Sequence, residues 1–152
     1  MQDTRLIANL LTSQEFAYEE LKPSTLNQVA NTPGVYMIYM KDESISELLK
    51  GVREGSILMN LQGEKFAPLY VGRTKNLQQR LYRNHLMGQQ NSAPVKYGLC
   101  KEKNMSPEEA KAFMRTHCRF KFWIVENVLT RCILEAHLIG LFAPPFNITE
   151  EH

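Results

Sequence analysis

The chain has 152 residues and a mass of 17.6 kDa, with 43% hydrophobic and 22% charged residues. This size and composition are typical of one globular domain, which needs neither disulfides nor a structural metal to fold. Its three cysteines are widely spaced, which predicts reduced thiols. No apolar run approaches the roughly 20 residues of a membrane span, and the N-terminus lacks a signal-peptide pattern, so we predict a cytoplasmic protein without a membrane partner.

Basic residues are concentrated in the middle of the chain. The net charge is +2, but residues 70 to 121 hold 11 basic and 3 acidic side chains. Such an excess is typical of a surface that binds a polyanion, because lysine and arginine near phosphates release counterions. Lysines such as Lys96, Lys101 and Lys103 could equally solvate an ordinary surface, so charge alone leaves nucleic-acid binding undecided.

The first part of the chain predicts helical pieces followed by a strand. Apolar residues at positions 6, 7, 10 and 11 have helical spacing, and a second helical piece leads from Thr12 towards Pro23, which ends it. The run 35–40 is apolar and rich in β-branched and aromatic residues, which indicates a strand. We therefore expect an N-terminal helical extension over residues 1–33.

The middle of the chain is harder to interpret. Residues 41–66 mix helical spacing with glycines and a short apolar run at 57–59 that could be a strand, and we interpret this segment as an insertion. A strand is predicted over residues 66–71, where Gly72 ends it. Asn76 can cap a helix with leucines at 77, 81 and 86, and another helical piece is expected over 93–103.

The last part of the chain carries clear helix signals. Ser106, Pro107 and Glu109 form a capping box that predicts a helix to about residue 117. A third strand is expected over residues 120–125, followed by a final helix that Asn127 caps and that runs through residue 142. No internal repeat or flexible linker argues for a second domain.

Glu135 lies at the edge of an apolar stripe on this final helix. On a helical wheel, the stripe consists of Val128, Cys132, Ala136 and Ile139. A carboxylate at such an edge is a candidate functional group, or it points outward and pairs with an arginine one turn earlier, Arg131. Taken alone, the helix favours the pairing with arginine.

Two tripeptides place these elements in a wider pattern. G-V-Y at residues 34–36 opens the first strand, and Y-V-G at 70–72 lies at the end of the second. Arg80 follows the second tripeptide by eight residues, the final helix carries Glu135, and P-P-F-N at 144–147 follows that helix. In this order, the five elements resemble the GIY-YIG nuclease superfamily over residues 34 to 148, and their joint spacing is far more specific than any one of them.

The resemblance implies a fold, a domain organisation and an activity. The fold would be α/β, with a small three-stranded, mainly antiparallel sheet flanked by helices. The nuclease domain would span residues 34–148, with an insertion at about 41–66 between the first two core strands, an N-terminal extension over 1–33 and a tail over 149–152. The activity would be divalent-metal-dependent hydrolysis of phosphodiester bonds in DNA.

The resemblance also implies roles for individual residues. Glu135 would hold one divalent ion, Mg²⁺ or Mn²⁺, and Arg80 would contact the scissile phosphate, assisted by Arg73. Tyr36 would take a proton from the attacking water, which requires nearby cations to lower its pKa, and Tyr70 would orient water or phosphate. Gly72 would support the site, and Asn147 would tie the end of the domain to it.

Some positions depart from the family pattern. Many members place a histidine or tyrosine four residues after the arginine, whereas this chain has Asn84 there and His85 next, so which of the two faces the site is open. Arg73 stands where members often have lysine. Two alternatives to a general nuclease remain: a non-catalytic module that binds nucleic acid or protein on the same fold, and a restriction-type endonuclease that reads a short sequence. A protein partner or a homodimer is also compatible with the sequence.

Overall fold

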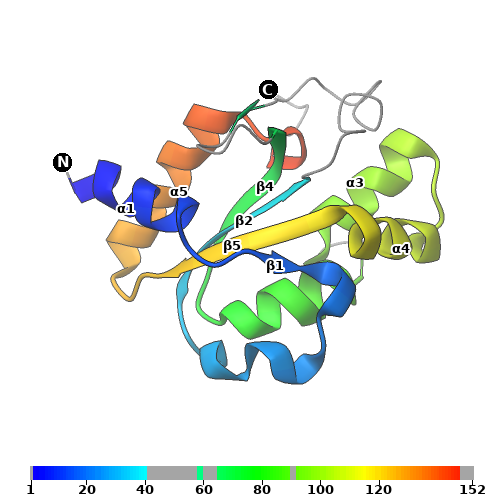
Figure 1. The fold of residues 1–152 in the computed structure, drawn as a ribbon, viewed down its shortest axis with the longest axis horizontal. Helices are drawn as coiled ribbons and strands as arrows, with labels where there is room; N and C mark the ends of the chain where they lie inside the picture. Colours follow the sequence, from blue (N-terminus) through cyan, green and yellow to red (C-terminus); the bar gives the residue numbers. More distant parts are fainter. Residues whose placement is uncertain (1, 41–57, 60–64, 90–91, 148–152) are drawn as a thin grey trace.

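The computed structural model describes residues 2–40, 58–59, 65–89 and 92–147. Within them, one antiparallel sheet has the strand order β1-β5-β2-β4-β3 (Figure 1). Its three long strands are β5 (Cys118–Ile124), β2 (Gly34–Met40) and β4 (Lys65–Thr74). Two-residue strands lie at the edges, β1 (Phe16–Ala17) and β3 (Leu58–Met59). The predicted α/β fold with a small antiparallel sheet is confirmed, and β1 adds a strand within the segment predicted to be helical.

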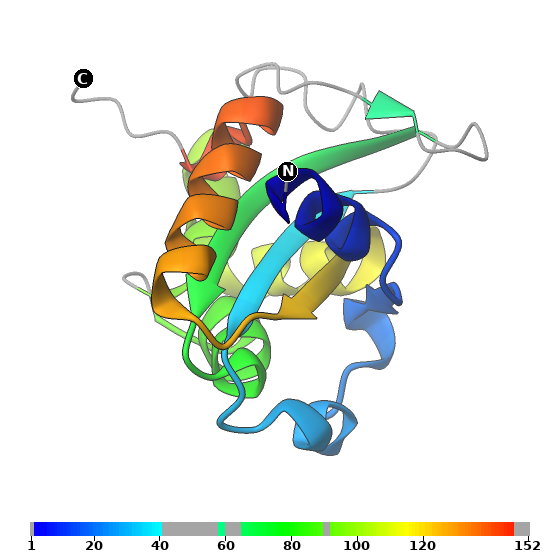
Figure 2. The same ribbon diagram turned by 90° about the vertical axis from the view of Figure 1, so that its left-hand side faces the viewer.

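Helices cover both faces of the sheet. Figure 2 shows α1 (Gln2–Leu11) and α5 (Val128–Phe142) on the near face. The opposite face carries α3 (Pro94–Lys103), α4 (Pro107–His117), the π-helix η3 (Gln79–Leu86) and two 3-10 helices, η1 (Tyr18–Glu20) and η2 (Pro23–Val29). A last 3-10 turn, η5 (Pro145–Asn147), lies against β4.

The central strand β2 separates two hydrophobic clusters. Val35 and Met37 pack with α1 and α5, whereas Tyr36 and Ile38 point to the cluster on the opposite face. All seven residues of β2 are buried, because both faces of the sheet are covered. This burial explains why the segment is a continuous apolar run in the sequence.

Capping residues set the helix starts as the sequence predicts. In α4, the Glu109 N–H donates to Ser106 Oγ at 3.1 Å, and the Ser106 N–H donates to Glu109 Oε1 at 2.9 Å. Asn127 caps α5 through its Oδ1, which accepts from the Thr130 N–H at 2.9 Å. These reciprocal bonds satisfy N–H groups that have no partner within their own helix.

The prediction that Gly72 ends the second strand is wrong. β4 continues to Thr74, because Gly72 stays in the ladder opposite Tyr36 and Thr74 pairs with Gly34. Glycine weakens a strand but keeps both backbone hydrogen-bonding groups, so a well-paired strand continues through it.

The predicted buried stripe of α5 is also wrong. The buried residues are Leu134, Leu138, Phe142 and Arg131, whereas Val128 is 62% exposed. This helix is apolar on most sides, so a helical wheel cannot select its inner face. Arg131 is buried because its guanidinium donates to two backbone carbonyls that precede the helix, at 2.9 and 2.8 Å.

Most of the predicted insertion at 41–66 lies outside the described residues. The described part of it consists of β3 at 58–59 and the first residues of β4. β3 pairs with Phe66 and Lys65. None of the described helices is both long enough and apolar enough to span a lipid bilayer.

Candidate active site

The two glycines of the tripeptides allow close approaches around Tyr36. A Cβ at Gly72 would lie 2.3 Å from the Tyr36 hydroxyl oxygen, so the tyrosine ring occupies the space above this glycine. A Cβ at Gly34 would lie 2.4 Å from the carbonyl oxygen of Trp123 on the neighbouring strand. These distances are shorter than any ordinary van der Waals contact, so both positions require glycine for steric reasons.

The Tyr36 hydroxyl is the centre of a buried polar cluster. It lies 2.7 Å from His85 Nε2, and Arg80 Nε donates to it at 3.1 Å. Tyr70 borders the cluster, with its ring centroid 6.2 Å from that of Tyr36 and 5.1 Å from that of His85. The structure thus brings together four residues that the sequence placed on two strands and one helix.

Arg80 fixes one hydrogen bond of the Tyr36 hydroxyl. An arginine side chain has only donors, so the Tyr36 oxygen accepts from Arg80, whereas the direction of its contact with His85 follows from the imidazole tautomer: an unprotonated Nε2 accepts the Tyr36 O–H. His85 Nδ1 is buried and has no hydrogen-bond partner among the described residues. Burial and the charge of Arg80 lower the pKa of His85 well below its usual 6.5, so the imidazole is neutral at pH 7.

His85, and not Asn84, contacts the cluster. The Asn84 side chain accepts from Gln79 Nε2 at 3.3 Å in an exposed setting on the same helix. His85 is fully buried against Tyr36, with ring centroids 5.3 Å apart. The question that the sequence left open is therefore answered by geometry.

Arg80 is also held by a backbone group of a second segment. Besides the tyrosine hydroxyl, its NH1 group donates to the Ser92 carbonyl at 2.9 Å. Sequence reasoning missed Ser92, because a backbone carbonyl leaves no signal in residue type. Two bonds to separate segments orient the guanidinium before any ligand binds.

Glu135 pairs with Arg73, and not with Arg131 as the isolated helix suggested. Arg73 NH1 donates to Glu135 Oε1, and the two side chains are 49% and 17% exposed. The pairing raises the pKa of Arg73, and it joins the carboxylate to β4 one residue after Gly72, which lies against the Tyr36 ring.

The expected lowering of the Tyr36 pKa is not found. Burial raises the pKa of this phenol well above its usual 10, and the opposing effect of Arg80 is smaller. Tyr36 is therefore a neutral hydroxyl at pH 7. The sequence showed the neighbouring cations but not the loss of solvent, which decides the direction.

Asn147 binds the open side of β4. Its Oδ1 accepts from the Val71 N–H and its Nδ2 donates to the Val71 carbonyl, both at 2.7 Å. One side-chain amide thus satisfies both polar groups of a residue next to Gly72, as a neighbouring strand would. These bonds join the turn after α5 to the strand that carries Tyr70.

A divalent ion is compatible with one carboxylate at this place. Among the described residues there is no group of three or more His, Cys, Asp or Glu side chains that could hold a metal. Mg²⁺ commonly takes one or two carboxylates, with water and substrate phosphate as its other ligands, and Glu135 is partly exposed and already pairs with a cation. The donor set fits a water-rich, oxygen-ligated site.

Part of the basic excess in residues 70–121 serves the fold. Lys96 is buried, contrary to a role in surface solvation, and its Nζ donates to the Leu86 carbonyl at 3.2 Å. Arg115 donates to the Tyr18 carbonyl at 3.1 Å, and Lys121 also bonds a backbone carbonyl. The arginines at the candidate site are Arg73 and Arg80, not the whole stretch.

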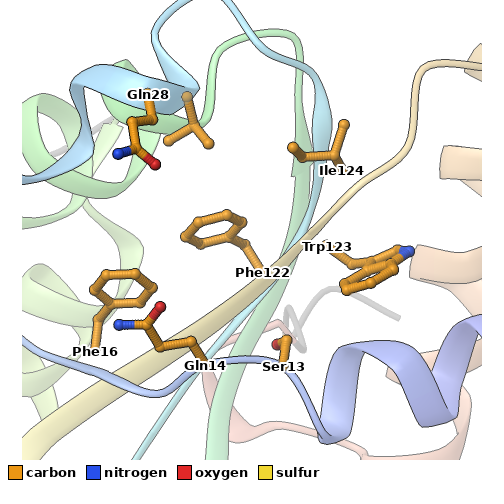
Figure 3. Close-up of a pocket in the computed structure, with 8 residues that line it drawn as sticks. Ser13, Gln14, Phe16, Gln28, Phe122, Trp123 and Ile124 are labelled. Atoms are coloured by element: carbon orange, nitrogen blue, oxygen red, sulfur yellow. The ribbon is translucent and has the colours of Figure 1, made fainter.

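A pocket of about 400 Å³ lies beside β5, away from these residues (Figure 3). Phe16 and Phe122 stack within it, with ring centroids 5.5 Å apart. It contains none of the predicted site residues. Its lining consists of Ser13, Gln14, Phe16, Gln28, Val29, Phe122, Trp123 and Ile124.

Comparisons with known proteins give a family and a set of solved structures. The sequence profile of the GIY-YIG catalytic domain matches residues 34–152. The chain is similar to the GIY-YIG N-terminal endonuclease domain of UvrC from Thermotoga maritima bound to its catalytic divalent cation, magnesium, with 19% identity, 95% of this chain and 97% of that chain covered, and a TM-score of 0.40. A cation-bound point mutant of that domain has 21% identity, coverage of 83% and 93%, and a TM-score of 0.43. A search of curated proteins finds no match.

Proposed function

Since the chain belongs to the GIY-YIG catalytic domain family, we propose that it is a divalent-metal-dependent endonuclease that hydrolyses phosphodiester bonds in DNA. The observation that carries the proposal is the convergence of Arg80 and His85 on the Tyr36 hydroxyl. The Glu135 carboxylate is held by Arg73, one residue after the glycine that lies against the Tyr36 ring. A neutral hydroxyl held between a fixed cation and a neutral imidazole is suited to move a proton.

Two arginines would bind the phosphate. Arg80 uses its Nε and NH1 groups in the bonds described, and the remaining guanidinium donors would contact the non-bridging oxygens of the scissile phosphate. Arg73 is half exposed, and it would move from Glu135 to the phosphate when substrate binds. Both charges would stabilise the negative charge that develops in the transition state.

Proton transfer would use Tyr36 and His85 together. As the attacking water forms its bond to phosphorus, the Tyr36 oxygen would take a proton from it and pass its own proton to His85 Nε2. The phenol would stay neutral, so the step avoids a buried phenolate, which the raised pKa of Tyr36 opposes. The imidazole would become cationic, and the negative charge of the bound phosphate would have to offset the burial and the charge of Arg80 that lower the pKa of His85. Tyr70 would orient the water or the phosphate.

Glu135 would hold one divalent ion, Mg²⁺ or Mn²⁺. That ion would supply electrostatic stabilisation of the charge on the phosphate and the leaving oxygen. The UvrC domain, which is named as bound to magnesium, is consistent with this choice.

The test compares wild type with Glu135→Gln on supercoiled plasmid and on linear, single-stranded and branched DNA, in Mg²⁺, Mn²⁺ or EDTA. Glu126→Gln, an exposed carboxylate just before α5, is the matched control. We expect metal-dependent nicking or cutting by wild type and the control, and none by Glu135→Gln, which keeps its shape but loses the charge that a metal requires. Full cleavage by Glu135→Gln would contradict the metal assignment.

The same assay separates the alternatives. DNA binding without cleavage by wild type, on all substrates and metals, would favour a non-catalytic binding module. Cleavage to discrete bands on linear DNA would favour a restriction-type enzyme that reads a short sequence, whereas a preference for branched DNA would indicate recognition of structure.

A further inference from the structure

Helix η3 is a π-helix, in which backbone hydrogen bonds span five residues instead of four. One such bond runs from the Met87 N–H to the Tyr82 carbonyl at 3.1 Å. π-helices are rare, and they occur frequently at functional sites. This one extends over Gln79–Leu86 and carries two side chains of the candidate site.

Side chains five positions apart on η3 also share a face of the helix. Arg80 and His85 are five positions apart, and both contact the Tyr36 hydroxyl oxygen, at 3.1 and 2.7 Å. Leu81 and Leu86 are also five apart, and both are fully buried. In an α-helix, a residue five positions further on is rotated by about 140°, so neither pair could share a face.

An α-helix over the same residues would present different side chains. One turn after Arg80 it would place Asn84, and one turn after Leu81 it would place His85. The imidazole would then enter the position of a buried leucine, and an amide would face Tyr36. Instead, the Asn84 side chain bonds Gln79 in an exposed setting.

We propose that the segment between Leu81 and His85 contains one residue more than an α-helix would need to bring the paired side chains to one face. The π-helix accommodates this extra residue, so that Arg80 and His85 meet at the Tyr36 hydroxyl. The π-turn is thus a positioning device that selects the histidine over the preceding asparagine. The inference rests on the proposed function only for its activity readout, because the contact itself is structural.

Deletion of Asn84 tests this inference directly. The deletion leaves Arg80 and the histidine four apart, and the two leucines four apart, which an ordinary α-helix accommodates. The matched control is deletion of Ala112, an exposed residue within the α-helix α4, which rotates the following residues by about 100°. We expect the Asn84 deletion to melt within a few degrees of wild type and the Ala112 deletion to melt roughly 10 °C lower or more.

Nitrogen NMR of the histidine rings gives the second readout. At about pH 5.5, wild type should show one imidazole that stays neutral, identified by its loss in His85→Gln, and the Asn84 deletion should retain it. A full-length variant with Asn84→His and His85→Asn should instead show a histidine that titrates near the usual value, because position 84 faces away from Tyr36.

Three outcomes would overturn the inference: an Asn84 deletion as unstable as the Ala112 deletion, loss of the neutral imidazole in the folded Asn84 deletion, or its retention in the exchanged variant. In the plasmid assay, the cleavage activity of the Asn84 deletion should fall by less than roughly 100-fold, the loss expected when a site is displaced. A larger loss of activity would also count against the inference. If wild type cleaves no DNA, the proposed function fails, while stability and NMR still decide the register.

Discussion

His85 couples the stability of the fold to pH. Its folded pKa lies below 6.5, the value expected in the unfolded chain, so the unfolded state binds the proton more readily. The stabilisation from a neutral His85 is complete above about pH 6.5 and is lost as pH falls, at no more than about 1.4 kcal/mol per pH unit. The histidine therefore makes the protein acid-sensitive before its carboxylates titrate.

Substitution of His85 should reduce this acid sensitivity. We expect His85→Gln to have a smaller difference in unfolding free energy between pH 7.5 and 5.5 than wild type, measured by urea denaturation. His137→Gln, at an exposed position of α5, is the control and should retain the wild-type difference. Equal pH dependence in wild type and His85→Gln would exclude His85 as the source.

Gly72 should not tolerate a side chain. The Cβ of Gly72→Ala would lie 2.3 Å from the Tyr36 oxygen and 2.5 Å from Cζ, so the ring or the strand must move. We expect a loss of about 1–3 kcal/mol in urea denaturation, as for other overpacked sites. Gly140→Ala is the control, because nothing lies within 4 Å of its Cβ. It should gain up to about 1 kcal/mol from helix propensity.

Arg73 would compete with the proposed divalent ion for Glu135. Because the guanidinium already pairs with the carboxylate, its removal should make that carboxylate easier to reach for a metal. We expect Arg73→Gln to bind Mn²⁺ several-fold more tightly than wild type without DNA, measured by titration of the Mn²⁺ EPR signal. Lys75→Gln removes a neighbouring exposed cation and should change the affinity less. Weaker binding by Arg73→Gln would show that the arginine helps to form the ion site.

At the scale of elements, β4 depends on a side chain for part of its backbone pairing. In Asn147→Ala, the Val71 N–H and carbonyl lose their partners, which costs about 1–3 kcal/mol for each polar group that stays buried. We expect lower stability in urea and faster hydrogen exchange at the Val71 amide, with the amides of β2 less affected. Unchanged exchange at Val71 would mean that water replaces the asparagine.

The sequence predicted elements wherever the deciding forces are local. The capping box at Ser106 and the Asn127 cap act within four residues, so they could be recognised without a structure. The inner face of α5 could not be recognised in this way. It depends on which side of the helix meets the sheet and on the backbone carbonyls that accept hydrogen bonds from Arg131. The five-residue spacing of Arg80 and His85 on η3 likewise acquires its meaning only from Tyr36, which lies on another element.

At the scale of the whole molecule, the prediction of the site rested on joint spacing, not on single residues. Tyr36, Tyr70 and Arg80 lie together, and His85, which the sequence left open against Asn84, lies with them. The direction of the Tyr36 pKa was wrong, because burial is a property of the assembled fold. The partner of Glu135 is Arg73, which lies on strand β4, so it could not be inferred from the sequence of helix α5.

Because the site joins both faces of one sheet, it should not melt separately. Tyr36 belongs to the hydrophobic cluster on one face of the sheet. Val71, two residues before Arg73 on β4, belongs to the cluster on the other face. We expect near-UV circular dichroism of the tyrosines and fluorescence of Trp123 to report the same urea midpoint, as in a two-state transition. A tyrosine signal lost at clearly lower urea would show a site that unfolds on its own.

The contacts at the site also join distant parts of the chain. The Arg80 bond to Tyr36 spans 44 residues, the Glu135 pair with Arg73 spans 62, and the Asn147 bonds to Val71 span 76. During synthesis at about 5–20 residues per second, roughly 5–20 seconds pass between the addition of Tyr36 and that of Asn147. A ribosome-bound chain therefore holds all the parts of this site only after Asn147 has been added, and until then the Val71 backbone lacks its side-chain partner.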